Sequence, residues 1–143
     1  MTRFSAPPSL ADLEVIALEE RDRLPEPFRA MVADVPVLIE DFCTDEDVLA
    51  ELGLENPWDL SGLYSGTAEP HKTTGHVARD TDRIFLFRRP LLDEWCETGV
   101  DLRELVRHVL IHEIGHHFGL SDDDMEAIEA KAEEESHRIQ PGA

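Results

Sequence analysis

The hydrophobic residues of this chain recur mainly with the period of a helix. Residues 9–24 carry apolar side chains three or four positions apart, behind a serine and an aspartate with the spacing of a capping box. Residues 101–119 show the same signals most clearly, and Gly119 suits the left-handed conformation that ends many helices. An acidic helix should follow from Ser121. Shorter helices are predicted from Pro27, from Thr44 to Gly53 and from Pro90 to Gly99.

Three short runs have the length and composition of β-strands. Residues 35–41 (VPVLIED) and 83–90 (RIFLFRRP) are rich in β-branched or aromatic residues. Residues 61–67 (SGLYSGT) are a weaker candidate, because glycine is costly inside a strand unless something must approach the backbone. The aperiodic loop of residues 68–82 is long enough to be functional or mobile. We expect exposed loop residues rather than ligands in its two histidines, His71 and His76.

Composition and charge narrow the classes of function. The 143 residues, 41% of them hydrophobic, fit one domain over residues 1–143, with frayed ends of about eight residues each. The net charge of -19 opposes binding to phosphate backbones, so nucleic-acid binding is not expected. No apolar run reaches the about 18 residues of a membrane span, and no secretory leader is recognisable. The expectation is a soluble, cytoplasmic protein in which Cys43 and Cys96 stay reduced.

Four of the seven histidines lie within HVLIHEIGHHFGLSDDDM, residues 108–125. His112 and His116 are one helical turn apart, so their Cβ atoms lie about 5–6 Å apart on one face and their imidazoles can share a metal ion. Glu113 is next to His112 in angle and can reach a water on that ion. The composition predicts about 0.04 chance occurrences of HExxH, and below about one in a thousand when Gly119 and an acid or histidine at position 122 are required. The motif therefore predicts a catalytic metal site.

The sequence offers more than one candidate for the third ligand. Catalytic zinc usually takes three protein ligands and leaves a fourth position open. Gly119 lets the chain turn back, so Asp122 is the preferred third ligand and the stretch conforms to HExxHxxGxxD. Asp122 also has a simpler explanation as an acid that complements the dipole of the last helix. Other candidates for the third ligand are Asp123, Asp124, Glu126 and Glu129.

Three further side chains lie near this motif or in the weaker strand. His117 is rotated by about 100° from His116, so it is expected at the edge of the core or beside the site rather than on the ion. His108 could form a hydrogen bond near the site or be exposed, and it is not expected to be a ligand. The hydroxyl of Tyr64 could steady an oxyanion, but a buried aromatic residue is the preferred interpretation.

The run HEIGHHFGLSDDDM, with LSGLYSG and RIFLFRRPL before it, resembles the small bacterial zincin-like metallopeptidases sometimes called minizincins. The resemblance covers residues 28–128 and implies an α+β, minimal zincin-like fold, in which a short mixed β-sheet is packed with helices and the HExxH helix crosses the sheet. It also implies one zinc ion, with ligands His112, His116 and Asp122 and with Glu113 as the catalytic residue.

Two further families share all or part of this motif but differ from the chain in other respects. Snapalysin-type proteases also have HExxHxxGxxD, but they are secreted. Metzincins have a histidine at the position of Asp122 and a methionine turn well downstream. Met125 follows Asp122 too closely to be that turn.

These observations predict a zinc metallopeptidase that acts on peptides or flexible protein segments. Glu113 would take a proton from the zinc-activated water and pass it to the leaving nitrogen, a role worth about 10²- to 10⁴-fold in rate. The competing hypothesis is a zinc protein without catalysis that uses the site for stability or for binding a partner, but such a site has no use for the glutamate. The two-histidine, one-carboxylate set also suits iron(II), although HExxH on a helix favours zinc. The sequence leaves the substrate, the oligomeric state and activity as an isolated chain undetermined.

Overall fold

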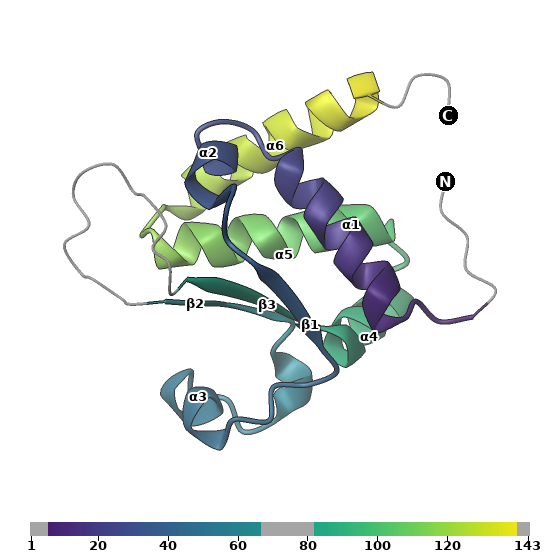
Figure 1. The fold of residues 1–143 in the computed structure, drawn as a ribbon, viewed down its shortest axis with the longest axis vertical. Coiled ribbons are helices and arrows are strands. Elements are labelled where there is room, and N and C mark those ends of the chain that lie inside the picture. The colour runs from purple at the N-terminus through teal and green to yellow at the C-terminus, as the bar shows by residue number, and fades with distance from the viewer. Residues whose placement is uncertain (1–5, 67–81, 140–143) are drawn as a thin grey trace.

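Helices surround a small sheet in this computed structural model, which describes residues 6–66 and 82–139 (Figure 1). The α+β class predicted from the sequence is confirmed. In chain order the described elements are α1 (Leu10–Asp22), α2 (Phe28–Val32), β1 (Val37–Glu40), α3 (Glu46–Glu51), the 3-10 turn η1 (Pro57–Asp59), β2 (Gly62–Ser65), β3 (Arg83–Phe87), α4 (Arg88–Thr98), α5 (Leu102–His117) and α6 (Asp122–Ile139).

The sheet is mixed, and β3 lies at its centre. β1 runs parallel to β3, with Val37 opposite Ile84, and β2 runs antiparallel to it, with Tyr64 also opposite Ile84. The sequence RIFLF thus belongs to the strand that pairs on both sides, where β-branched and aromatic residues pack best. The weaker strand, β2, is an edge strand.

The helices α1 and α5 cover one face of the sheet, and α6 packs against α5 (Figure 1). α5 contributes the largest share of the core, because its apolar stripe at helical spacing is buried against these neighbours. On the opposite face, the short helix α3 covers a smaller apolar cluster (Figure 1). Residues of α5 with no exposed surface are Val106, Leu110, Ile111 and Ile114.

α5 approaches the edge strand closely at Gly62. A Cβ atom at this position would lie 2.6 Å from Cγ1 of Val109 and 3.3 Å from Cγ of Glu113 and from the carbonyl oxygen of Phe85. Contacts this short are far tighter than normal packing allows. The glycine that weakens the strand signal is therefore what lets the HExxH helix lie directly on β2.

Most predicted helix ends agree with the structure. Ser9 forms a complete capping box at the start of α1. The Asp101 carboxylate accepts hydrogen bonds from two main-chain N–H groups in the first turn of α5, and the Ser121 hydroxyl accepts one in α6. Gly119 has a φ of +74°, the left-handed conformation expected after a helix.

Several predicted boundaries are wrong, three of them for reasons that the structure shows. Asp45 rather than Thr44 caps α3, because its carboxylate accepts from the N–H groups of Asp47 and Val48. The strand predicted to reach residue 90 ends at Phe87, where the pairing with β1 also ends and a helix begins. α6 continues to Ile139, beyond the predicted helix end at residue 135, since no proline or glycine interrupts it before Pro141.

Some predictions concern residues that the structure does not describe. The loop of residues 68–82 lies outside the described part except at its last position, and so do His71 and His76. The predicted fraying of residues 1–5 and 140–143 also lies outside it. Among the described helices, none combines the length and the apolar character needed to cross a bilayer.

A buried ion-pair network fixes α1 against α5. Glu20 is only 2% exposed, and its carboxylate contacts Arg107 and Arg103 of α5 at 3.4 Å each. Arg103 also pairs with Glu19 at 2.7 Å. The carboxylate of Glu20 is removed from water. Its negative charge therefore depends on these arginines for stabilisation.

Candidate metal centre

Three histidines form a stripe along α5. His108, His112 and His116 are spaced by four residues and therefore lie one above another on the same face of the helix. The ring centroids of His108 and His112 are 4.2 Å apart, and those of His112 and His116 are 5.9 Å apart at an interplanar angle of 85°. The predicted shared face of His112 and His116 is thus present, and His108 extends it by one turn.

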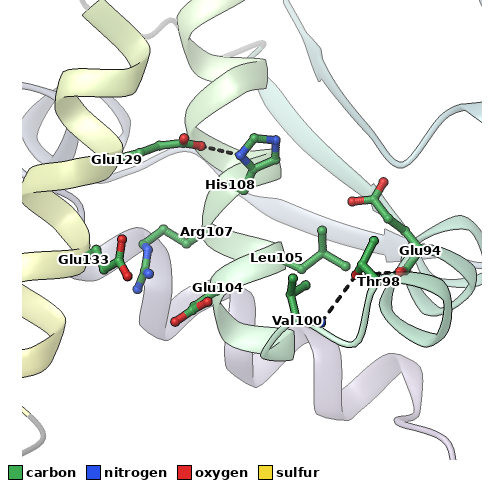
Figure 2. A pocket seen from close by; sticks show the side chains of 9 residues that line it. All are labelled: Glu94, Thr98, Val100, Glu104, Leu105, Arg107, His108, Glu129 and Glu133. Atoms are coloured by element: carbon green, nitrogen blue, oxygen red, sulfur yellow. Dashed lines mark hydrogen bonds and ion pairs between the residues drawn. The ribbon is translucent and has the colours of Figure 1, made fainter.

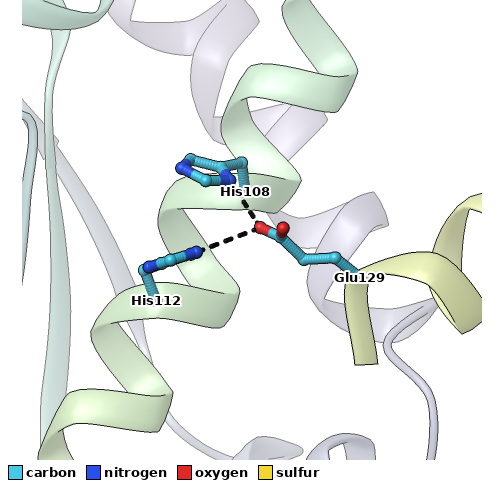
Figure 3. A group of neighbouring side chains, drawn as sticks. All are labelled: His108, His112 and Glu129. Carbon is cyan, nitrogen blue, oxygen red and sulfur yellow. Dashed lines mark ion pairs between the residues drawn. The ribbon is translucent and has the colours of Figure 1, made fainter. Parts of the chain in front are cut away.

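α6 brings a carboxylate to the first two of these histidines (Figure 3). Oε1 of Glu129 contacts Nδ1 of His108 and lies 3.4 Å from Nε2 of His112. One ligand atom of each of these three residues lies within 4.8 Å of the other two. His108 was not expected to be a ligand, so this grouping is a feature that helical spacing alone did not predict.

His116 and Asp122 are both exposed, and both influence the pKa of His112. Burial lowers the pKa of His112, and the neighbouring His108 and His116 lower it further. The carboxylates of Glu129 and Asp122 oppose this shift. A lowered pKa favours the neutral imidazole, which is the form that binds metal ions. Whether His112, His116 and Asp122 share one ion stays a prediction.

Glu113 lies apart from this group, against the edge strand β2. Its carboxylate accepts a hydrogen bond from the main-chain N–H of Tyr64, and its side chain packs beside Gly62. Burial raises the pKa of Glu113 to about 7, and the Tyr64 N–H only partly offsets this effect. The carboxyl group can therefore exchange a proton near neutral pH.

A second polar cluster surrounds Tyr64 and involves an aspartate, Asp82, that the sequence analysis did not single out. The hydroxyl of Tyr64 donates a 2.7 Å hydrogen bond to Oδ2 of Asp82, a residue with no exposed surface. The ring of His117 stacks on Tyr64 with centroids 3.9 Å apart, and its Nε2 lies 4.0 Å from the same Asp82 oxygen. Burial and Asp82 both raise the pKa of Tyr64. Tyr64 is therefore a buried aromatic residue, and His117 lies at the edge of the core.

The spacing between α5 and α6 depends on a glycine inside the HExxH motif. A Cβ atom on Gly115 would overlap Sδ and Cγ of Met125, which is fully buried. The absence of a side chain at Gly115 thus lets α6 pack closely on α5. Because α6 carries both Asp122 and Glu129, this contact determines how near the two carboxylates lie to the histidine stripe.

A cavity of about 330 Å³ adjoins the group of His108 and Glu129 (Figure 2). Its polar lining is mostly acidic, and Arg107 is the cationic residue that lines it besides the titratable His108. Other carboxylates in the lining are Glu94, Glu104 and Glu133.

Comparison with known proteins bears directly on this arrangement. The sequence model of a family described as zincin-like metallopeptidase matches residues 32–132, more than two thirds of the chain. The chain belongs to the zincin-like metallopeptidase family. The resemblance found in the sequence is thereby confirmed, and six helices around a three-stranded mixed sheet agree with a minimal zincin-like fold in the described part of the chain. A search of curated proteins gave no match.

Membership of the zincin-like metallopeptidases implies zinc binding, and the donor set fits this ion. Imidazole nitrogens and carboxylate oxygens are zinc ligands, and the first histidine of HExxH, His112, lies among them. Neither Cys43, in the apolar cluster under α3, nor the exposed Cys96 belongs to this group.

Proposed function

We propose that this zincin-like metallopeptidase hydrolyses peptide bonds with one zinc ion held by His112, His116 and Asp122. The observation that carries the proposal is the division of labour around HExxH. His112 and His116 share one face of α5, whereas Glu113, one residue after His112, is held against β2. A purely structural zinc site would have no use for a carboxylate held beside the metal ligands in this way.

The choice of His116 and Asp122 as further ligands rests on the motif and on electrostatics. His116 is one turn from His112 on the same face, and Asp122 follows the left-handed Gly119 at the first residue of α6. His116 lowers the pKa of His112, and Asp122 raises it. Two imidazoles and a carboxylate leave a fourth zinc position free for water or substrate.

Glu113 would move the proton during hydrolysis. Zinc, when bound, makes a water more acidic and polarises the substrate carbonyl. The Glu113 carboxylate accepts the proton of the attacking water and delivers it to the amide nitrogen as that nitrogen leaves. The N–H of Tyr64 orients the carboxylate, and the partial burial of Glu113 keeps its proton affinity suited to both steps.

The edge strand β2 supports a peptide as the substrate class. β3 pairs with β1 on one side and with β2 on the other, so the second edge of β2 pairs with no other strand in the described sheet. Such an edge can pair with an extended peptide through main-chain hydrogen bonds. The bond from Tyr64 to Glu113 places this edge directly beside the proposed base.

The test combines metal analysis with peptidase assays on unstructured peptides. Wild-type protein purified without added metal should contain about one zinc per chain. The Glu113→Gln variant should keep the zinc and lose at least about tenfold in kcat/KM. Glu97→Gln, which changes an exposed glutamate at the end of α4, serves as the control and should retain wild-type activity.

Two metal-binding variants complete this test. His112→Ala should lose the zinc, and zinc retained near one per chain in His112→Ala would refute the site as a whole. Asp122→Ala should lose at least about tenfold in kcat/KM, and unchanged peptidase activity in this variant would move the third ligand to another acid of α6. A rate loss smaller than about tenfold in Glu113→Gln would exclude it as the base.

A non-catalytic zinc protein is the second candidate, and one observation favours it. His108 and Glu129 lie close enough to His112 to add donors around it, and structural zinc sites fill all four positions. In that case Glu113→Gln would bind zinc normally, and neither it nor the wild type would cleave any peptide. Zinc removal would instead lower the melting temperature.

A further inference from the structure

We propose that His108, His112 and Glu129 form a second zinc position, which shares His112 with the catalytic position and therefore excludes it. The proposal rests on the proposed function only in calling the other position catalytic. Its three ligands come from two helices, α5 and α6, and their side chains point toward one another (Figure 3). One of them, Glu129, is the only carboxylate in this group of described residues.

The separation between His112 and Glu129 matches the coordination shell of a zinc ion, whereas Nδ1 of His108 lies closer to Oε1 of Glu129, at 2.5 Å. Ligand atoms at about 2.0–2.1 Å from a tetrahedral ion lie about 3.3 Å from one another. The separation between Nε2 of His112 and Oε1 of Glu129 is 3.4 Å, and all three ligand atoms lie within 4.8 Å of one another. Binding of an ion therefore requires the side chains of His108 and Glu129 to move apart.

His112 cannot serve both positions through the same nitrogen. The second position uses Nε2, the atom that faces Glu129. An ion bound there lies one turn toward the start of α5, in the direction of His108 and away from His116. Zinc in this position would lack the ligands His116 and Asp122, so the proposed catalytic set would be incomplete.

The surroundings of the second position allow zinc to enter. His108 is exposed, with 50% of its side chain accessible, and it lines the cavity of about 330 Å³ together with Glu129 (Figure 2). The acidic lining of that cavity attracts cations. Water in the cavity can fill the fourth coordination position. The second position thus has an open route to solvent next to the proposed catalytic ligands.

The decisive experiment measures zinc binding in a variant that lacks two catalytic ligands. We expect chelator-treated His116→Ala/Asp122→Ala to bind one zinc per chain in a calorimetric titration. Adding His108→Gln or Glu129→Gln to this variant should weaken binding at least about 100-fold, since even the loss of an outer partner of a ligand costs about 10- to 100-fold. Adding Glu97→Gln, which changes an exposed glutamate at the end of α4, should not change the affinity. His116 and Asp122 are themselves exposed, so circular dichroism should show an intact fold.

The outcomes separate this proposal from the proposed function. Absence of zinc binding in His116→Ala/Asp122→Ala, or binding that ignores His108 and Glu129, overturns the second position. Two zinc ions per chain in the wild type overturn the exclusion. A wild type that never cleaves peptides, but whose variants bind zinc as described, overturns the proposed function and leaves the second position standing.

A kinetic measurement tests the exclusion without the double variant. The two positions offer the same donor types, two imidazoles and one carboxylate, so their populations should be comparable. His108→Gln should therefore raise kcat by up to about twofold, with an unchanged KM and still one zinc per chain. A kcat that falls in His108→Gln would contradict the exclusion.

Discussion

In the metal-free protein, replacing Glu113 by glutamine should increase stability at neutral and alkaline pH. The carboxyl group is partly buried between α5 and β2, and burial raises its pKa from 4.5 to about 7 despite the opposing hydrogen bond from Tyr64. Folding therefore makes this group harder to ionise, whereas glutamine keeps the shape and carries no charge. The variant removes an unfavourable burial of charge from the folded state.

The magnitude follows from the two pKa values. A rise from 4.5 to about 7 corresponds to about 3 kcal/mol, at about 1.4 kcal/mol for each tenfold change in proton affinity. Because the folded pKa is the higher one, the stabilising proton is bound below it and is lost as the pH rises through about 7. The advantage of glutamine should be small near pH 4.5 and should grow by about 2 kcal/mol between about pH 5.5 and about pH 8.5.

The assay is urea unfolding in the presence of a chelator, from about pH 5.5 to about pH 8.5. Wild type and Glu113→Gln are compared with Glu97→Gln, which changes an exposed glutamate at the end of α4 and should show no pH-dependent difference. The reasoning would be refuted by a constant difference between wild type and Glu113→Gln over this range. It would also be refuted by an advantage that shrinks at alkaline pH.

Three further predictions concern packing and charge. Gly62→Ala places a Cβ 2.6 Å from Val109 and should cost about 1–3 kcal/mol in urea unfolding, with a fall in peptidase activity; unchanged stability would mean that α5 does not depend on this contact. Gly115→Ala should push α6 away from α5 through the overlap with Met125, despite a gain of up to about 1 kcal/mol in helix propensity. The affinity for zinc, measured by competition with a zinc-binding dye, should fall at least about tenfold. Glu20→Gln should cost about 3 kcal/mol in urea unfolding because Arg107 loses its buried partner. Equal losses in Glu20→Gln and in the partly exposed Glu19→Gln would contradict the assigned burial.

The local elements could be predicted because their signals are carried by neighbouring residues. Asp101 caps the start of α5, and Gly119 adopts the left-handed conformation after its end, both as expected. Strand boundaries were less accurate, since the end of β3 at Phe87 is set by where its partner β1 ends. A strand has no fixed end without its neighbour, whereas a helix closes its own hydrogen bonds.

The sequence by itself determined that His112 and His116 share a face and that Glu113 turns away from it, because the period of a helix is set by its backbone. Which other side chains join them was decided only by the packing of one element on another. Glu129 reaches His108 because Gly115 admits Met125 and brings α6 close to α5. Asp82 meets the hydroxyl of Tyr64 because Tyr64 lies opposite Ile84, and Asp82, two residues before Ile84, is its diagonal neighbour across the two strands. Such contacts join residues far apart in the chain, and no local periodicity encodes them.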